Sequence, residues 1–148
     1  MTQTFTPTWT PPPFPGTSLL GLDASTLLEL GDAVDQGFQS AALEGLARHL
    51  GMTLGQMLAL LGVSESTYHS RRRSGRPLSA DDSAALYHLA RVTEAAEQYF
   101  TDPAEAHRWL SAPRVTFGNR TPLQFALLPG GAEYVTAVLG RLEHGVYV

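Results

Sequence analysis

The chain has 148 residues, of which 43% are apolar and 16% charged, and it contains no cysteine. This length suits one domain or two small ones that share a core, and the lack of cysteine excludes disulfides and thiol chemistry. The net charge of −4 argues against a protein that coats nucleic acid regardless of sequence. With no apolar run long enough for a bilayer and no secretory leader, we expect a cytoplasmic protein without a membrane partner.

Residues 1–20 predict a proline-rich tail. Five of the ten prolines fall in the first fifteen positions, and proline lacks the N–H donor that a helix or a central strand needs. Phe5, Trp9 and Phe14 are unexpected there, because a purely solvated linker has little use for aromatic side chains. Two interpretations stay open: a disordered leader, and an extended arm that docks on a partner or on a second subunit.

Two helices are predicted next, one from Asp23 to about Gln36 and one from Ser40 to Gly51. Asp23 and Ser40 are the expected N-caps. Apolar residues at helical spacing predict one buried face for each helix. The residues expected to face inward are Leu27, Leu30, Val34, Leu43, Leu46, Ala47 and Leu50. Residues 1–47 carry acidic residues, Glu44 among them, and no basic one, so this part must turn away from any bound DNA.

Residues 51–76 predict a helix-turn-helix unit. Thr53 and Gln56 have the spacing of a capping box that begins the first helix. Gly62 supplies a left-handed corner, and Ser64 caps the second helix. Leu58 stands where a small residue is usual, so a slightly opened helix crossing is expected. The apolar residues that should pin the two helices together are Met57, Leu61, Val63 and Tyr68.

An arginine cluster lies at the end of this unit. The chain has no lysine, and four of its ten arginines lie within positions 71–76. At the end of a recognition helix, such a cluster predicts contact with DNA phosphates. The predicted DNA-binding residues are Ser64, Ser66, Thr67, His69, Ser70, Arg71, Arg72, Arg73 and Arg76. The alternative is an ordinary helix pair with a solvated basic end.

The remainder also predicts helices. Ser79 begins a long one to about Phe100, and Asp102-Pro103 begins a shorter one that ends at Pro113. Residues 117–120 are expected to form a loop. A second capping box at 121–124 opens a helix through position 128, and a last helix runs over residues 132–145. The predicted buried stripes are Leu86, Leu89, Val92, Ala96 and Phe100, then Ala132, Val135, Val138, Leu139 and Leu142.

Motifs of enzyme chemistry are missing from the sequence. No P-loop, G-x-G-x-x-G or G-x-S-x-G pattern occurs. The five histidines have no spacing that puts two of them on one helical face with a carboxylate, so no metal site is expected. Glu143 and His144 are adjacent, and neighbouring side chains on a helix point about 100° apart. We therefore expect a protein that is not an enzyme and needs no cofactor.

Three C-terminal motifs resemble one protein family. They are Tyr99-Phe100-x-Asp102-Pro103-x-x-Ala106-x-x-Trp109-Leu110, Gly118-x-Arg120-Thr121-Pro122-Leu123, and LGRLEHGVY at residues 139–147. These motifs resemble the toxin-binding domain of Xre/MbcA/ParS-type antitoxins, and residues 46–92 look like the Xre-like part of the same proteins. The resemblance covers roughly residues 25–148, and the proline-rich tail lies outside it.

The resemblance implies an all-α fold, with an Xre-like helix-turn-helix bundle over residues 21–98 and a small helical toxin-binding domain over residues 99–148. It implies a homodimeric type II antitoxin whose partners are a RES-domain toxin, which depletes NAD, and the operator DNA of its own operon. The terminal segment would block the toxin's active site. The toxin-binding residues so implied are Arg120, Arg141, Glu143, His144, Gly145, Val146 and Tyr147. For Arg120, a structural salt bridge is an equal alternative.

Two other classes of function stay open on the sequence. One is a stand-alone helix-turn-helix transcriptional regulator without a toxin partner. The other is an interaction protein whose helix-turn-helix serves only dimerisation.

Overall fold

The computed structural model of the chain describes residues 14–143, apart from the side chain of Glu143. Over this range it has eight α-helices and two short 3-10 helices and no strand, which confirms the predicted all-α fold. None of the described helices combines the length and apolarity needed to cross a membrane. The elements are η1 (Ser18–Leu20), α1 (Leu27–Gln36), α2 (Ser40–His49), α3 (Leu54–Leu61), α4 (Glu65–Arg73), α5 (Ala80–Tyr99), α6 (Pro103–Ser111), η2 (Val115–Phe117), α7 (Pro122–Ala126) and α8 (Gly131–Glu143).

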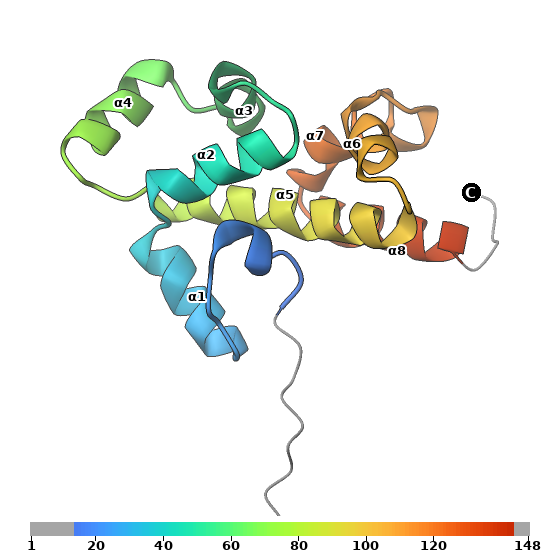
Figure 1. Cartoon of the computed structure of the whole chain (residues 1–148), viewed down its shortest axis with the longest axis horizontal. Coiled ribbons are helices and arrows are strands. Elements are labelled where there is room, and N and C mark those ends of the chain that lie inside the picture. Colours follow the sequence, from blue (N-terminus) through green and yellow to red (C-terminus); the bar gives the residue numbers. More distant parts are fainter. Residues whose placement is uncertain (1–13, 144–148) are drawn as a thin grey trace, which may run out of the picture.

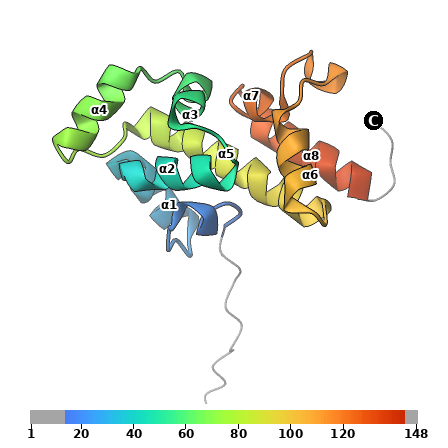
Figure 2. The same ribbon diagram turned by 45° about the horizontal axis from the view of Figure 1, so that its top comes forward.

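The long helix α5 runs through the middle of the molecule (Figure 1). Ser79 begins it as predicted, accepting the N–H of Asp82 on its side chain. Helices α1 and α3 and η1 pack on one part of α5, α2 packs on η1 and α3, and α6 to α8 pack on the other part of α5 (Figure 2). The buried face of α5 therefore belongs to both halves of the core. It comprises Ser83, Leu86, Leu89, Ala90, Val92, Thr93 and Ala96.

The predicted helix-turn-helix is present as α3 and α4. The capping box is complete, because Thr53 accepts the N–H of Gln56 and the Gln56 side chain accepts the N–H of Thr53. Gly62 forms the corner with φ of 72°, a left-handed conformation that glycine adopts without strain. Of the four apolar residues predicted to hold the two helices together, Met57 and Tyr68 are fully buried, and Leu61 and Val63 are half-buried.

The predicted start of the first helix is wrong. Asp23 does not cap it. The N-cap is Thr26, whose backbone is extended and whose side chain accepts the N–H of Glu29. Leu27 then falls in the first turn of α1, which points away from the bundle in Figure 1, and it is 72% exposed rather than buried. Leu30 is buried, and Val34 is half-buried against the core.

The predicted cap of the second helix is also displaced. Ser40 is the first residue of α2, and Gln39 occupies the N-cap position without a side-chain hydrogen bond. The inward residues of α2 are nevertheless as expected, because the hydrophobic spacing does not depend on the cap. They are Leu43, Leu46, Ala47 and Leu50.

The end of the proline-rich stretch is part of the core. Thr17 and Leu20 are buried, so the expectation of a tail does not hold for residues 14–20, whereas residues 1–13 lie outside the described part. Gly16 has φ of +88°, and a Cβ there would lie 2.6 Å from the backbone nitrogen of Arg91. Glycine thus lets this segment lie directly on α5, where the Gly16 N–H donates to the carboxylate of Glu94.

The C-terminal helices enclose an aromatic cluster. Phe117, which was expected in a loop, is only 1% exposed and ends the short helix η2. Its ring centre lies 5.9 Å from that of Trp109, 5.1 Å from that of Phe125 and 6.0 Å from that of Tyr134. This prediction failed because the glycine and asparagine after Phe117 marked a turn and gave no sign of its burial.

The predicted helix starts in this half are confirmed. Asp102 caps α6 by accepting the N–H of Ala104, and Thr121 forms a complete capping box with Gln124 at the start of α7. Leu142 of α8 is half-buried, and the expected stop at position 145 lies outside the described residues. The buried residues of α8 are Ala132, Val135, Val138 and Leu139.

Candidate functional site

The predicted DNA-binding residues lie on one exposed helix. All nine belong to α4 or its flanks, and all are exposed except Arg71, which is half-buried. Ser64 is occupied as the helix cap, because it accepts the backbone N–H of Thr67 at 3.2 Å and donates to the Thr67 hydroxyl at 2.7 Å. A shallow hollow of 290 Å³ follows the helix and is lined by Ser66, Thr67, Ser70, Arg71 and Arg76.

The four clustered arginines differ in what they contact. Arg71 donates from Nη1 to the carbonyl oxygen of Pro77 at 3.1 Å, which closes the loop after α4. Arg76 donates from Nε to the Ser74 hydroxyl at 3.0 Å. Within residues 14–143, Arg73 makes no hydrogen bond or ion pair through its side chain. Arg73 is therefore the cluster member whose side chain is least constrained by contacts within the described residues.

A single carboxylate from α2 holds α4 in place. The Tyr68 hydroxyl donates to Glu44 Oε1 at 2.6 Å, and Arg72 Nη1 lies 3.3 Å from the same oxygen. Burial raises the pKa of Tyr68 to about 12, and the hydrogen bond to Glu44 adds to this effect. The expectation that the acidic residues turn away from the arginine cluster is therefore wrong for Glu44. Sequence reasoning missed its role because Glu44 and Tyr68 are 24 positions apart.

The predicted toxin-binding residues are only partly described. Arg120 and Arg141 are exposed, whereas the Glu143 side chain and residues 144–147 lie outside the described part of the chain. The alternative role for Arg120 was a structural salt bridge, and none forms among the described side chains. The Arg120 carbonyl accepts the N–H of Arg114 at 3.1 Å, so its backbone is fixed while its side chain faces solvent.

The loop that carries Arg120 is rigidly built. Arg114 lies over the Trp109 ring at 5.1 Å, and burial lowers the pKa of its guanidinium. Asn119 has φ of +63° and donates its N–H to the Arg114 carbonyl, which makes a tight reversal. The loop leaves Val115 87% exposed. Sequence reasoning missed Arg114 and Val115, because nothing local distinguishes a stacked arginine from a solvated one.

Three side chains from separate helices also meet at one point. His49, Glu97 and His107 come from α2, α5 and α6, and their potential ligand atoms lie within 4.8 Å of one another. The sequence analysis did not predict this group, because it considered only histidines on the same helix, and these two histidines lie on different helices. Two imidazoles and one carboxylate are a set of ligands that metal ions use in proteins.

The comparisons with known proteins agree with this arrangement. Residues 29–91 match the family described as the antitoxin Xre-like helix-turn-helix domain. Residues 95–145 match the family described as the antitoxin Xre/MbcA/ParS C-terminal toxin-binding domain.

Three curated relatives bear the name Antitoxin Xre. One from Yersinia enterocolitica is 28% identical over 86% of this chain and 87% of its own length, and one from Photorhabdus laumondii is 27% identical over 86% of each. A third, from Pseudomonas putida, is 34% identical over 53% of this chain and 50% of its own length.

The two matched regions correspond to the two parts of the fold that share α5. A helix-turn-helix domain implies DNA binding, and a toxin-binding domain implies a toxin partner. The family consists of antitoxins and not of enzymes. The chain belongs to the Xre/MbcA/ParS family of antitoxins, with an Xre-like helix-turn-helix domain followed by a C-terminal toxin-binding domain.

Proposed function

We propose that this antitoxin neutralises a RES-domain toxin that depletes NAD, and that it represses its own operon through α4. The observation that carries this proposal is the separation of the two surfaces. The exposed face of α4 lies at one end of the molecule, and the end of α8 lies at the other (Figure 1). A bound toxin at the second surface therefore leaves α4 free to bind DNA.

Neutralisation is assigned to the last residues of the chain. In the proposal, Glu143 to Tyr147 enter the toxin's active site and exclude its substrate, while Arg120 and Arg141 contact the surface around it. Arginine and tyrosine are frequent anchors of protein interfaces, and a segment that carries charge and an aromatic ring suits a polar nucleotide pocket. The exposure of Arg120 on a fixed loop supports the part proposed for it.

Repression is assigned to a homodimer that places two copies of α4 in successive major grooves. The half-sites would then lie about one helical turn apart, roughly 34–36 Å. Ser66, Thr67 and Ser70 would face base edges, and Arg73 and Arg76 would bind phosphates. The exposure of these five side chains, four on α4 and Arg76 just after it, supports the assignment.

The toxin half is tested by co-expression with the product of the neighbouring gene. We expect the two proteins to co-purify, and the full-length antitoxin to restore cellular NAD and growth. Deleting residues 146–148 should weaken neutralisation without unfolding the protein. A truncated protein that still protects NAD fully would refute occlusion by the terminal segment, and the absence of any NAD loss without the antitoxin would refute the toxin class.

The repression half is tested with a fragment of the operon's own promoter. We expect retardation of this fragment at concentrations where a scrambled fragment is free, and light scattering should give the mass of a dimer. A reporter driven by the promoter should be repressed by the antitoxin. Equal binding to both fragments would contradict sequence-specific repression.

A further inference from the structure

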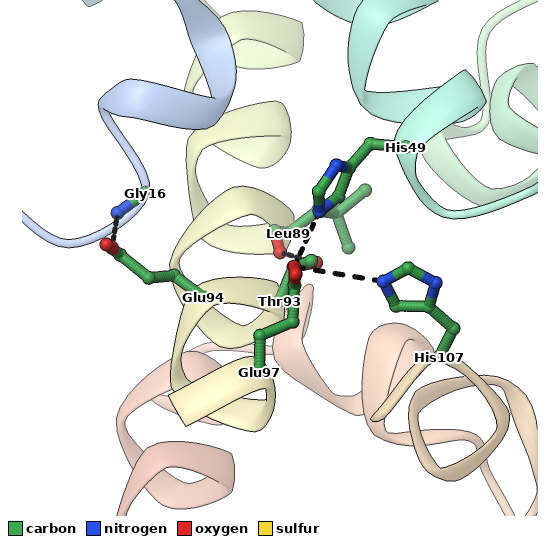
Figure 3. Close-up of polar contacts among 7 residues, drawn as sticks. All are labelled: Gly16, His49, Leu89, Thr93, Glu94, Glu97 and His107. Carbon is green, nitrogen blue, oxygen red and sulfur yellow. Dashed lines mark hydrogen bonds and ion pairs between the residues drawn. The ribbon is translucent and has the colours of Figure 1, made fainter. Parts of the chain in front are cut away.

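His49, Glu97 and His107 converge where the helix-turn-helix half of the molecule meets the C-terminal half (Figure 3). His49 is the last residue of α2, Glu97 lies near the end of α5, and His107 lies within α6. We propose that these three side chains form a binding site for a divalent transition-metal ion, with Zn²⁺ as the best match.

All three potential ligand atoms lie within 4.8 Å of one another, and two of the distances between them bear on a bound ion. His49 Nε2 lies 2.6 Å from Glu97 Oε1, and His107 Nε2 lies 3.8 Å from the same oxygen. Tetrahedral zinc with bonds of about 2.0–2.1 Å places its ligand atoms roughly 3.4 Å apart. The first contact must therefore widen and the second must shorten, each by less than about 1 Å. Rotation of side chains can supply such shifts without movement of the helices.

One of the proposed ligand atoms is buried without a hydrogen-bond partner in the described part of the chain. His107 Nε2 is buried and has no hydrogen-bond partner among the described residues, because 3.8 Å is too long for a hydrogen bond. A buried polar atom without a partner costs free energy. A metal ion between Glu97 and His107 would satisfy this nitrogen, whereas the hydrogen bond between His49 and Glu97 leaves it unsatisfied.

The chemistry of the group selects the ion. Two imidazole nitrogens and a carboxylate oxygen suit zinc, whose catalytic and exchangeable sites often use three protein ligands and leave one position open. The side chains of His49, Glu97 and His107 are 36%, 22% and 20% exposed, so the group borders solvent although His107 Nε2 itself is buried. The open position would take water or a donor from a bound protein.

The site would connect the two functional halves. Its ligands belong to α2, which holds α4 through Glu44, and to α6, which packs Trp109 into the aromatic cluster. An ion bound to both helices and to α5 would stabilise their relative positions, because it binds the folded state and not the unfolded one. This consequence is independent of which toxin the protein binds.

The experiment uses the untagged full-length antitoxin, stripped of metal with a chelator and titrated with Zn²⁺ in a calorimeter. Cobalt substitution reports the coordination through visible absorption. We expect one ion per chain, a rise in the melting temperature with Zn²⁺, and a cobalt spectrum of low coordination number. His107→Gln should lower the affinity at least 10- to 100-fold, since even outer-shell changes have effects of about that size.

His69→Gln is the matched control, because His69 is exposed on α4 and far from the proposed ligands in the fold. It should bind Zn²⁺ as the wild type does. Glu97→Gln and His49→Gln provide further variants if His107→Gln is poorly folded by circular dichroism. Equal Zn²⁺ affinity in all of these variants would overturn the proposal, because the ion would then bind elsewhere. Absence of Zn²⁺ binding by the wild type would also overturn it, and the three side chains would then form only a hydrogen-bonded cluster.

Discussion

Each end of this antitoxin is stabilised by a different kind of interaction. At the DNA-binding end, the buried Tyr68 ring anchors α4, and its hydroxyl and Arg72 share one oxygen of Glu44. At the toxin-binding end, aromatic rings pack against one another around Phe117, and Arg114 covers the edge of the cluster over Trp109.

The difference follows from what each end must expose. Tyr68 is the one buried residue of α4, so this helix has little apolar area to bury, and the hydrogen bond and ion pair to Glu44 add to its orientation. The C-terminal half is stabilised by the burial of large aromatic rings, so the loop that carries Arg120 and the exposed side of α8 are available to a partner. The orientation of α4 should therefore depend on charge and pH. The stability of the C-terminal half should depend on the volume of its buried side chains.

The largest expected effect is that of Phe117→Ala at the aromatic end. Removal of a fully buried ring should lower the free energy of unfolding by about 3–5 kcal/mol, because of the lost burial and the cavity that remains. Urea unfolding followed by circular dichroism measures it. Val115→Ala in the same short helix should change stability by less than about 0.5 kcal/mol. A loss below 1 kcal/mol for Phe117→Ala would mean that the cluster is not the core of this end.

Tyr68→Phe should cost less, about 1–2 kcal/mol, because it keeps the buried ring and removes only the hydrogen bond to Glu44. Affinity for the promoter fragment should fall, because α4 loses part of its orientation, while toxin binding should be unchanged. Tyr134→Phe is the matched control on the partly exposed ring at the other end. If both variants bind DNA equally, Glu44 does not position α4.

The raised pKa of Tyr68 predicts a dependence on alkaline pH. A group whose pKa is higher in the folded state stabilises that state below its ordinary pKa, and this contribution is lost as pH rises. For Tyr68 the loss should occur between the ordinary value of 10.0 and about 12. Thermal unfolding across this range should show a steeper decline in the wild type than in Tyr68→Phe. Parallel curves would contradict the burial of this hydroxyl in the folded protein.

Arg73→Ala should affect DNA binding and leave folding intact, because this side chain contacts neither a carboxylate nor a carbonyl within the described residues. The slope of log affinity against log salt should fall by about 0.9 for one lost phosphate contact. Arg108→Ala on α6 is the matched control, with an exposed arginine outside the cluster. An unchanged slope for Arg73→Ala would favour a helix-turn-helix that serves dimerisation only.

The smallest expected effect is that of Glu133→Gln. Glu133 pairs with Arg91 at 2.9 Å between α8 and α5, but its side chain is 58% exposed. Exposed ion pairs contribute about 0.2–1 kcal/mol or less, so the melting temperature should hardly change. A loss of 2 kcal/mol or more would show that electrostatics, and not apolar burial, joins the toxin-binding end to α5.

The features that the sequence predicted correctly are local ones. The caps Thr53, Ser64, Asp102 and Thr121 bond to N–H groups two or three positions along the chain, so their spacing alone identifies them. Helical periodicity likewise identified the buried face of α2 and, apart from Phe100, which follows α5 and is half-buried, the predicted stripe of α5. The wrong cap at Asp23 shows the limit, because several capping residues stood together and only the fold selected Thr26.

By itself, then, the sequence determined most of the helices, the corner at Gly62 and the arginine cluster at the end of α4, since each depends on residues within one or two turns. Only the tertiary structure decided that Glu44 meets Tyr68, that Phe117 enters a core, and that His49 and His107 meet at Glu97. The physical reason is that these contacts join side chains of different elements, such as Glu44 and Tyr68, 24 positions apart, and His49 and Glu97, 48 positions apart. No local spacing encodes such contacts, and the stabilisation they provide exists only once the helices are assembled.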